Sequence, residues 1–177
     1  QTTAITVTDV NEATPEFSDG ATASANVAEV TTVGTYAATD ADGTSALTYS
    51  IVSSASDGGS VDSDLFTINS ATGALTFTTA PNYEAPGCGA GNNALVCVVI
   101  LSVTDTSSTD TITVTATITD LNEAVPEFTA GATAAANVAE ETTAVATYAA
   151  TDADGTATQT YSIVASGTDA ASVDSDL

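Results

Sequence analysis

Hydrophobic and polar residues alternate in short runs along most of the chain. Ile112, Val114, Ala116 and Ile118 alternate with threonine, a period of two that is typical of a strand with one buried face. Residues 95–103 form a nearly continuous apolar run, which favours a central strand. Further strands are expected near residues 22–29, 33–39, 45–52, 65–69 and 73–79, between turns rich in Gly, Asp, Asn and Ser. No stretch keeps a helical period. About seven short strands predict an all-β fold, an immunoglobulin-like Greek-key β-sandwich.

A long internal repeat divides the chain. Residues 9–17 (DVNEATPEF) return as residues 120–128 (DLNEAVPEF), and residues 39–44 and 61–65 return at 151–156 and 173–177. One residue inserted between Glu140 and Tyr148 changes the offset from 111 to 112. A period this long is a whole domain. We therefore expect a tandem array within a longer polypeptide: residues 1–10 are the last strand of a preceding repeat, residues 11–121 a complete repeat, and residues 122–177 the first half of the next.

The charge balance excludes several classes of function. The 177 residues include 23 carboxylates but no Lys, Arg or His, for a net charge of −23. Without basic side chains, nucleic acid and anionic membrane surfaces are not expected partners. Without His, neither a Ser-His-Asp triad nor a Cys-His pair can form. No apolar run is long enough to span a membrane. We expect a protein that is not an enzyme, and the 43% of hydrophobic residues argue against disorder.

The carboxylates gather at the expected ends of the domains. The groups are Asp120-x-Asn122-Glu123, Asp152-x-Asp154 and Asn82-Tyr83-Glu84, with single acids at Glu29 and Asp105. Alternating oxygen side chains lie on the same side of an extended backbone, as calcium requires when it collects six to eight oxygen ligands. Since no basic side chain can neutralise these acids, we expect a hard divalent cation to do so. The alternative for each motif alone is a solvated turn, because Asp, Asn and Gly form turns.

The same motifs resemble cadherin repeats in their bacterial cadherin-like form. The resemblance runs in order through residues 27–29 (VAE), 38–43 (ATDADG), 47–51 (LTYSI), 65–68 (LFTI), 72–75 (TGAL), 82–84 (NYE), 103–105 (VTD) and 120–123 (DLNE). It covers the complete repeat and both flanking pieces. In this family the linker between repeats binds about three calcium ions, with ligands from both domains and the linker.

The resemblance implies two ligand sets. The first would comprise Glu29, Asn82, Glu84, Asp120, Asn122, Glu123, Asp152 and Asp154, and the second Asp9, Asn11, Glu12, Asp40, Asp42 and Asp105. Three positions depart from the family, in which Asn82, Glu12 and Glu123 are usually Asp. The remaining acids, among them Asp57, Asp62, Asp64 and Asp110, are expected on solvated surface or in turns. Paired carboxylates also serve glycoside hydrolysis, but no Trp is present to stack a sugar.

Two cysteines flank a segment rich in Gly and Asn. Cys88 and Cys97 enclose Gly89-Ala90-Gly91-Asn92-Asn93, so we predict a disulfide, which suits an oxidising extracellular compartment. The alternative is two free thiols, with Cys97 buried and Cys88 exposed.

Two functions of different kinds remain. The first is a calcium-stiffened structural repeat of a long extracellular filament or a surface adhesin stalk, whose partners are neighbouring repeats and, laterally, like chains. The second is an adhesive binding module that recognises carbohydrate or a like repeat on a neighbouring cell. Only nine aromatic residues occur, which favours the stalk. Another immunoglobulin-like fold, from a type-I-secreted bacterial adhesin, is the alternative architecture.

Overall fold

The computed structural model describes residues 1–43, 46–52, 62–89, 94–155 and 158–163. It consists of two units, Gln1–Leu121 and Asn122–Leu177. Asp57 and the repeated segment at residues 173–177 lie outside the described residues.

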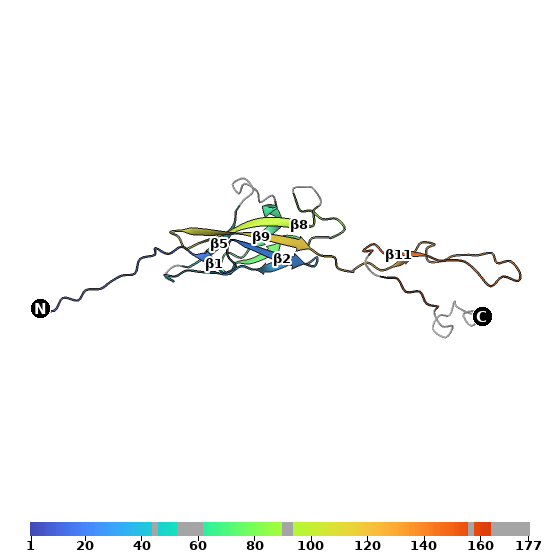
Figure 1. Ribbon diagram of the computed structural model, residues 1–177, viewed down its shortest axis with the longest axis horizontal. Coiled ribbons are helices and arrows are strands. Elements are labelled where there is room, and N and C mark those ends of the chain that lie inside the picture. The colour runs from blue at the N-terminus through green and yellow to red at the C-terminus, as the bar shows by residue number, and fades with distance from the viewer. Residues whose placement is uncertain (44–45, 53–61, 90–93, 156–157, 164–177) are drawn as a thin grey trace. The chain divides into compact units, whose positions relative to one another are not determined.

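The first unit is built on a four-stranded sheet with the order β2-β9-β8-β5 (Figure 1). Its strands are β2 (Thr22–Val27), β5 (Thr48–Ile51), β8 (Val96–Thr104) and β9 (Thr109–Ile118). β8 pairs antiparallel with both β9 and β5, whereas β2 runs parallel to β9. The turn between β8 and β9 begins at Asp105, so this acid lies at one end of the sheet, directly after β8.

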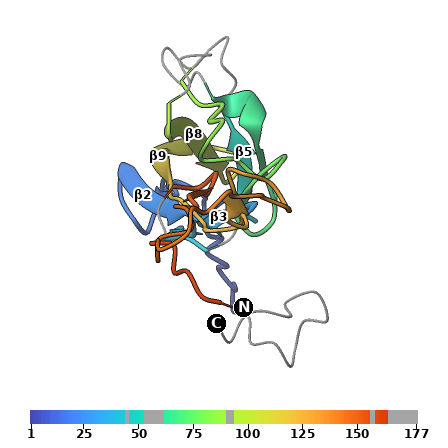
Figure 2. The same ribbon diagram turned by 90° about the vertical axis from the view of Figure 1, so that its right-hand side faces the viewer.

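A second layer closes the sandwich. It contains β3 (Thr32–Thr35), β7 (Ala74–Phe77) and β6 (Phe66–Ile68) in the order β3-β7-β6, and the 3-10 turn η1 (Ser63–Leu65) precedes β6. β1 (Glu16–Phe17) pairs antiparallel with β4 (Ala38–Thr39). Seen end-on, β2, β9, β8 and β5 follow one another and β3 lies in the other layer (Figure 2). The all-β, immunoglobulin-like Greek-key sandwich predicted from the sequence is confirmed.

The core lies between the two layers. Leu101 and Val103 of β8 and Ile112 and Val114 of β9 are fully buried, as the alternation predicts, and Leu75 meets them from β7. Fully burying an aliphatic side chain of this size contributes about 1.5–3 kcal/mol. The contacts among these core residues are therefore apolar.

One glycine is required by the close approach of two segments. Gly73 has a φ of 71°, and a Cβ at this position would lie 2.3 Å from the carbonyl oxygen of Tyr36. Its own carbonyl accepts a hydrogen bond from the Tyr36 N–H at 3.0 Å. This contact falls in the middle of the strand expected at 33–39, which divides because β3 pairs with β7 and β4 pairs with β1. β1 was not predicted, because a two-residue strand leaves no periodic pattern.

Residues 1–10 form no strand and are exposed (Figure 1). Ile5 and Val7 are 87% and 90% exposed. A strand needs a hydrogen-bonded neighbour, and no described strand lies beside this segment. Its assignment to a preceding repeat stays a prediction.

The second unit reproduces the local geometry at the start of the first. β10 (Glu127–Phe128) pairs with β11 (Ala150–Thr151) as β1 pairs with β4. The rings of Phe128 and Tyr161 lie 6.2 Å apart, as do those of Phe17 and Tyr49. In both units the tyrosine hydroxyl accepts a backbone N–H at 3.0 Å, from Ala150 and Ala38 respectively. Over the described residues, no helix has the length and apolarity that crossing a membrane requires.

Candidate metal centre

The loop after β4 holds the segment that leads into the first sandwich. The Asp40 Oδ1 accepts the Asp42 N–H at 2.9 Å, which closes a tight turn. The Asp42 Oδ2 then accepts the N–H groups of Glu12 and Ala13 at 2.8 and 2.5 Å. Because these hydrogen bonds fix the backbone at Glu12, they also fix the neighbouring residue, Asn11.

Asp105 holds the Asn11 side chain from the other side. Its carboxylate is fully buried; the Oδ1 accepts the N–H groups of Ser107 and Ser108, and the Oδ2 accepts the Asn11 Nδ2–H at 3.0 Å. The Ser108 N–H lowers the pKa of Asp105 most; burial raises it, and hydrogen bonds from Ser107 and Asn11 lower it further. The net effect is a pKa well below the ordinary range, so Asp105 is an anion that orients the Asn11 amide.

This arrangement leaves two oxygen atoms buried without a partner. They are the Asn11 Oδ1 and the Asp40 Oδ2, which accept no hydrogen bond within the described part of the chain. Leaving a buried acceptor unsatisfied costs about 1–3 kcal/mol, so each of these oxygens is a candidate ligand for a cation or a hydrogen-bond donor. Asp9 and the Glu12 side chain, in contrast, are exposed.

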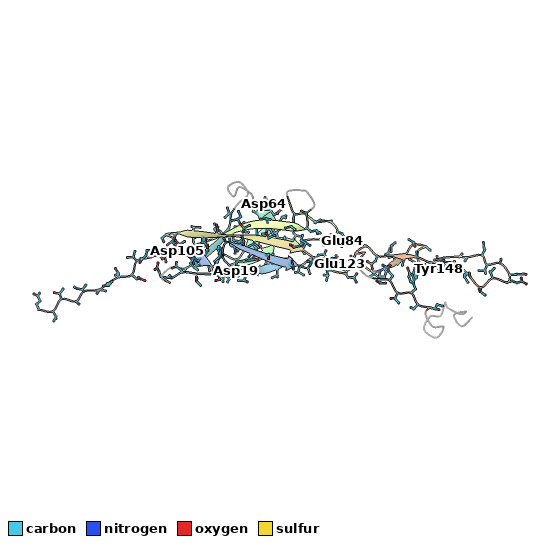
Figure 3. All side chains as sticks on the ribbon, viewed as in Figure 1. Asp19, Asp64, Glu84, Asp105, Glu123 and Tyr148 are labelled. Atoms are coloured by element: carbon cyan, nitrogen blue, oxygen red, sulfur yellow. A yellow bond between two sulfur atoms is a disulfide. The ribbon has the colours of Figure 1, made fainter. Side chains whose placement is uncertain are left out.

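A second group of acids lies at the opposite end of the first unit, and Figure 3 shows Asp105 and Glu84 at these two ends. Glu29 has a φ of 47°, which is unusual outside glycine. Its two carboxylate oxygens accept the N–H groups of Tyr83 at 2.8 Å and Leu121 at 2.7 Å. Glu29 therefore ties the segment before the disulfide loop to the end of β9.

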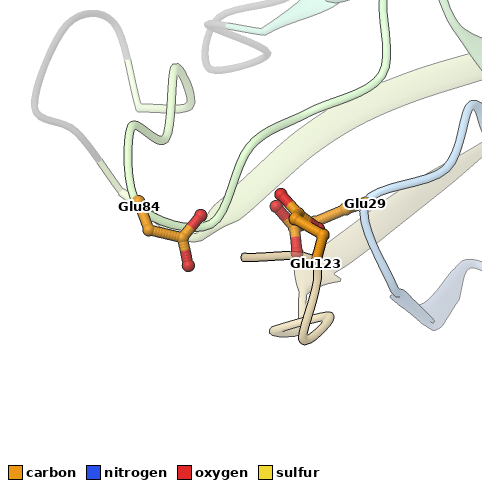
Figure 4. Close-up of side chains that lie close together, drawn as sticks. All are labelled: Glu29, Glu84 and Glu123. Carbon is orange, nitrogen blue, oxygen red and sulfur yellow. The ribbon is translucent and has the colours of Figure 1, made fainter. Parts of the chain in front are cut away.

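The Glu29 and Glu84 carboxylates approach each other within 4.8 Å (Figure 4). A third acid on the first unit, Asp120, has a buried Oδ1 with no partner among the described residues. The Asn82 Oδ1 accepts the Ala85 N–H at 2.6 Å, and its side chain is exposed. Thus the first unit gathers Glu29, Glu84 and Asp120 around its C-terminal end, with Asn82 in the adjoining turn.

The second unit carries the remaining predicted ligands. The Asp152 Oδ1 accepts the Asp154 N–H at 3.1 Å, and the Asp154 Oδ2 accepts the Ala124 N–H at 2.6 Å. This is the arrangement of Asp40, Asp42 and Ala13 in the first unit. Asn122 and Glu123 are exposed at the beginning of the second unit, and Glu123 is also drawn in Figure 4.

The chemistry of these groups suits one kind of ion. Every candidate ligand is a carboxylate or amide oxygen, the donor set of calcium, and zinc would need His or Cys. The two cysteines are not available, since they form a disulfide with a Cα–Cα distance of 4.9 Å. The predicted disulfide is confirmed. The alternative of two free thiols with Cys88 exposed is excluded, because both bonded residues are buried in the core.

The sequence did not reveal two features. Ser107 and Ser108 supply the hydrogen bonds to Asp105, but a pair of serines after a strand predicts only a turn. Asp62 was expected on solvated surface or in a turn; it lies in a turn, but it is buried, with 2% of its surface exposed. Its two oxygens accept the N–H groups of Gly89 and Val98, both at 2.8 Å. Each donor directly follows a cysteine, so Asp62 fastens both ends of the disulfide loop.

Comparison with solved structures identifies the fold. The human desmocollin-1 ectodomain matches with a TM-score of 0.52 and 26% identity, over 69% of this chain and 23% of that one. Protocadherin gamma B2 extracellular cadherin domains 1–5 match with a TM-score of 0.52 and 21% identity, over 82% and 27%. Human mucin-like protocadherin EC1-2 matches with a TM-score of 0.50 and 22% identity, over 64% and 57%. The chain spans less than two thirds of each structure's length. The fold is therefore cadherin-like. No family model and no curated protein matches the chain.

Proposed function

We propose that this chain is a calcium-stiffened structural repeat of a long extracellular filament or adhesin stalk, without catalytic activity. The observation that carries the proposal is the set of buried oxygens without a partner, the Asn11 Oδ1, the Asp40 Oδ2 and the Asp120 Oδ1. The chain has no basic side chain that could satisfy them. Cations bound at the two ends of the first unit would satisfy these oxygens, and calcium is the ion whose donor set matches.

In each cluster, some ligands would be in place before calcium binds, and others would move to close around the ion. At the start of the complete repeat, Asn11, Asp40, Asp42 and Asp105 are held by the hydrogen bonds described above, and Asp9 and Glu12 would close around the ion. At its end, Glu29, Glu84 and Asp120 would be joined by Asn82. Asn122, Glu123, Asp152 and Asp154 would complete the ligand set, with about three ions per linker as the resemblance implies.

Calcium would act as a mechanical joint. Without it, the linker acids and the acids of both repeats repel one another, and salt screens them only partly, because the Debye length is about 8 Å at physiological ionic strength. An ion bound by both repeats favours the arrangement that assembles the site. The buried disulfide and the ectodomain origin of the structural match to desmocollin-1 support an extracellular, adhesion-type setting.

Small-angle scattering with and without a chelator tests this function. We expect the maximum dimension of the 177-residue chain to be fixed in calcium and to become variable after chelation. A protease of broad preference should then cleave within residues 120–126, while far-UV circular dichroism is retained. Trypsin is unsuitable, since the chain contains no Lys or Arg. Magnesium at the same concentration is the control. An unchanged scattering curve and unchanged cleavage in chelator would refute the calcium joint.

A further inference from the structure

Asp62 is a buried carboxylate that the proposed calcium sites do not use. It is 2% exposed, and the chain contains no Lys, Arg or His that could pair with it. Burying a charge is costly unless hydrogen bonds compensate for it. Both carboxylate oxygens accept such bonds, the Oδ1 from the Gly89 N–H and the Oδ2 from the Val98 N–H, each at 2.8 Å. The carboxylate is therefore committed to two backbone groups.

The two donors are adjacent to the two cysteines. Gly89 directly follows Cys88 in the chain. Val98 directly follows Cys97. The cysteines are separated by nine positions in sequence, and their Cα atoms lie 4.9 Å apart. A single side chain thus binds the backbone at both ends of the segment that the disulfide closes.

The second layer of the sandwich holds Asp62 in place. Its carbonyl oxygen accepts the Leu65 N–H at 3.0 Å across η1. The Leu65 carbonyl in turn accepts the Thr78 N–H at 2.8 Å, directly after β7. The Asp62 side chain makes no capping hydrogen bond to η1. The carboxylate therefore serves the neighbours of the cysteines and not the turn that it precedes.

The strand pairing explains why Val98 takes an acceptor from outside the sheet. β5 pairs with β8 at residues 101–104, so Val98 lies beyond the end of that pairing. A buried backbone N–H needs an acceptor, and Asp62 supplies the one that a longer β5 would otherwise supply. Gly89 has a φ of 74°, a conformation that favours glycine. Both donors are thus placed by local backbone features and not by the disulfide alone.

We propose that Asp62 is a positioning residue for disulfide formation: it holds the backbone beside Cys88 and Cys97 together before the bond forms. Closing a flexible loop costs conformational entropy. In the dithiol protein, the two hydrogen bonds to Asp62 already order both ends of the segment, so the two thiols are at a high effective concentration. Because coupling is reciprocal, the finished disulfide strengthens the same two hydrogen bonds.

The reaction is a thiol–disulfide exchange with an external disulfide, such as glutathione disulfide. The thiolate of one cysteine attacks glutathione disulfide, which forms a mixed disulfide and releases one glutathione thiolate. The thiolate of the second cysteine then attacks the sulfur of the first, which forms the Cys88–Cys97 bond and releases the second glutathione thiolate. Two cysteine thiols are oxidised, one glutathione disulfide is reduced, and the two thiol protons pass to solvent or to the released thiolates. Asp62 exchanges no bond; it lowers the entropy cost of the second step.

The alternative is that Asp62 only stabilises the fold. Its two hydrogen bonds would then be equally strong in the dithiol and disulfide forms, and the effective concentration of the thiols would not depend on them. Either way, the inference concerns the disulfide and does not depend on the proposed calcium sites.

Equilibration of the 177-residue chain in mixtures of glutathione and glutathione disulfide distinguishes the two roles. The ratio of disulfide to dithiol protein, measured by mass spectrometry after alkylation, gives the effective concentration of the thiols. Asp62→Asn keeps one acceptor oxygen and replaces the other by a nitrogen that cannot accept. It should lower the effective concentration about tenfold, equivalent to about 1.4 kcal/mol, which is close to one hydrogen bond to a charged group.

Asp64→Asn is the matched control, the same change at an exposed position of η1. It should leave the effective concentration unchanged. Equal values for wild type and Asp62→Asn would overturn the proposal, because Asp62 would then serve both forms alike. Equal losses in Asp62→Asn and Asp64→Asn would also overturn it, because the effect would then come from charge alone.

A second measurement needs no substitution and decides the matter if Asp62→Asn does not fold. Wild type is refolded under a reductant, and its folding is checked by circular dichroism. Amide hydrogen exchange at Gly89 and Val98 should be slow in this dithiol protein, since both N–H groups are already bound to Asp62. Fast exchange at both positions, or a dithiol protein that does not fold, would overturn the proposal, because the segment would then be ordered only after the bond forms.

Discussion

Replacing Asp40 by Asn tests whether Asp40 binds calcium or only holds the turn through its carboxylate. The Asp40 Oδ1 accepts the Asp42 N–H, whereas the Oδ2 is buried without a partner among the described residues. Asparagine keeps the first oxygen, and with it the turn, but replaces the second oxygen by an amide nitrogen that cannot bind a cation. The substitution also removes one negative charge from an acidic loop. Asp40→Asn should therefore be close to neutral without calcium and costly with it.

The expected magnitude follows from binding linkage. A ligand at one hundred times its dissociation constant stabilises the folded state by about 2.7 kcal/mol, and a tenfold loss of affinity removes about 1.4 kcal/mol of this. For a domain of about one hundred residues, 1 kcal/mol shifts the melting temperature by about 4–8 °C. Thermal unfolding in calcium should then differ between wild type and Asp40→Asn by about 5–10 °C. In EDTA the two should agree within about 1 kcal/mol.

Differential scanning calorimetry at several calcium concentrations gives both values. Asp64→Asn is the matched control, because Asp64 is exposed in η1 and far in sequence from either cluster. It should leave the calcium-dependent gain intact. If Asp40→Asn lowers stability by the same amount with and without calcium, Asp40 serves the fold only. The calcium assignment at the start of the repeat would then be wrong.

Two further substitutions test the structure independently of calcium. Asp62→Ala leaves the N–H groups of Gly89 and Val98 without their acceptor and should lower the free energy of unfolding by about 2–4 kcal/mol. Denaturant titration of the oxidised protein measures this free energy. An effect as small as that of Asp64→Ala would contradict the prediction. Thr106 has a φ of 86°, so Thr106→Gly should relieve backbone strain and raise stability by about 1 kcal/mol. The same change at Thr109, within β9, should lower stability instead, and a loss at both positions would show that the turn is not strained.

The sandwich could be predicted from the sequence because its signal is local and periodic. The alternation of Ile112, Val114, Ala116 and Ile118 with threonine specifies which face of β9 is buried, and the structure buries these four residues. Short pieces such as β1 carry no period, and residues 33–39 divide because their two halves pair with different strands, β7 and β1. The fold class therefore follows from pattern, whereas the breaks in the strands follow from tertiary contacts.

The sites were predictable only in part, for a related reason. The resemblance to cadherin repeats marked Asp40, Asp42 and Asp105 as candidate ligands, because the motifs that carry it can be read along the chain. The role of Asp62 is not visible there. A carboxylate in a turn looks solvated, and only the folded chain places it against Gly89 and Val98. Burial of an acid becomes predictable only when its hydrogen-bond donors are known.

In the proposed array, the distribution of charge would separate the stability of a sandwich from the stiffness of the joint between repeats. The core of the first unit consists of apolar side chains and a buried disulfide, and the described carboxylates at its two ends take no part in that core. Removing calcium would therefore act on the ends first, where the unpartnered oxygens lie. If calcium binds there as proposed, its removal would act on the ends of the first unit and leave the apolar core unchanged.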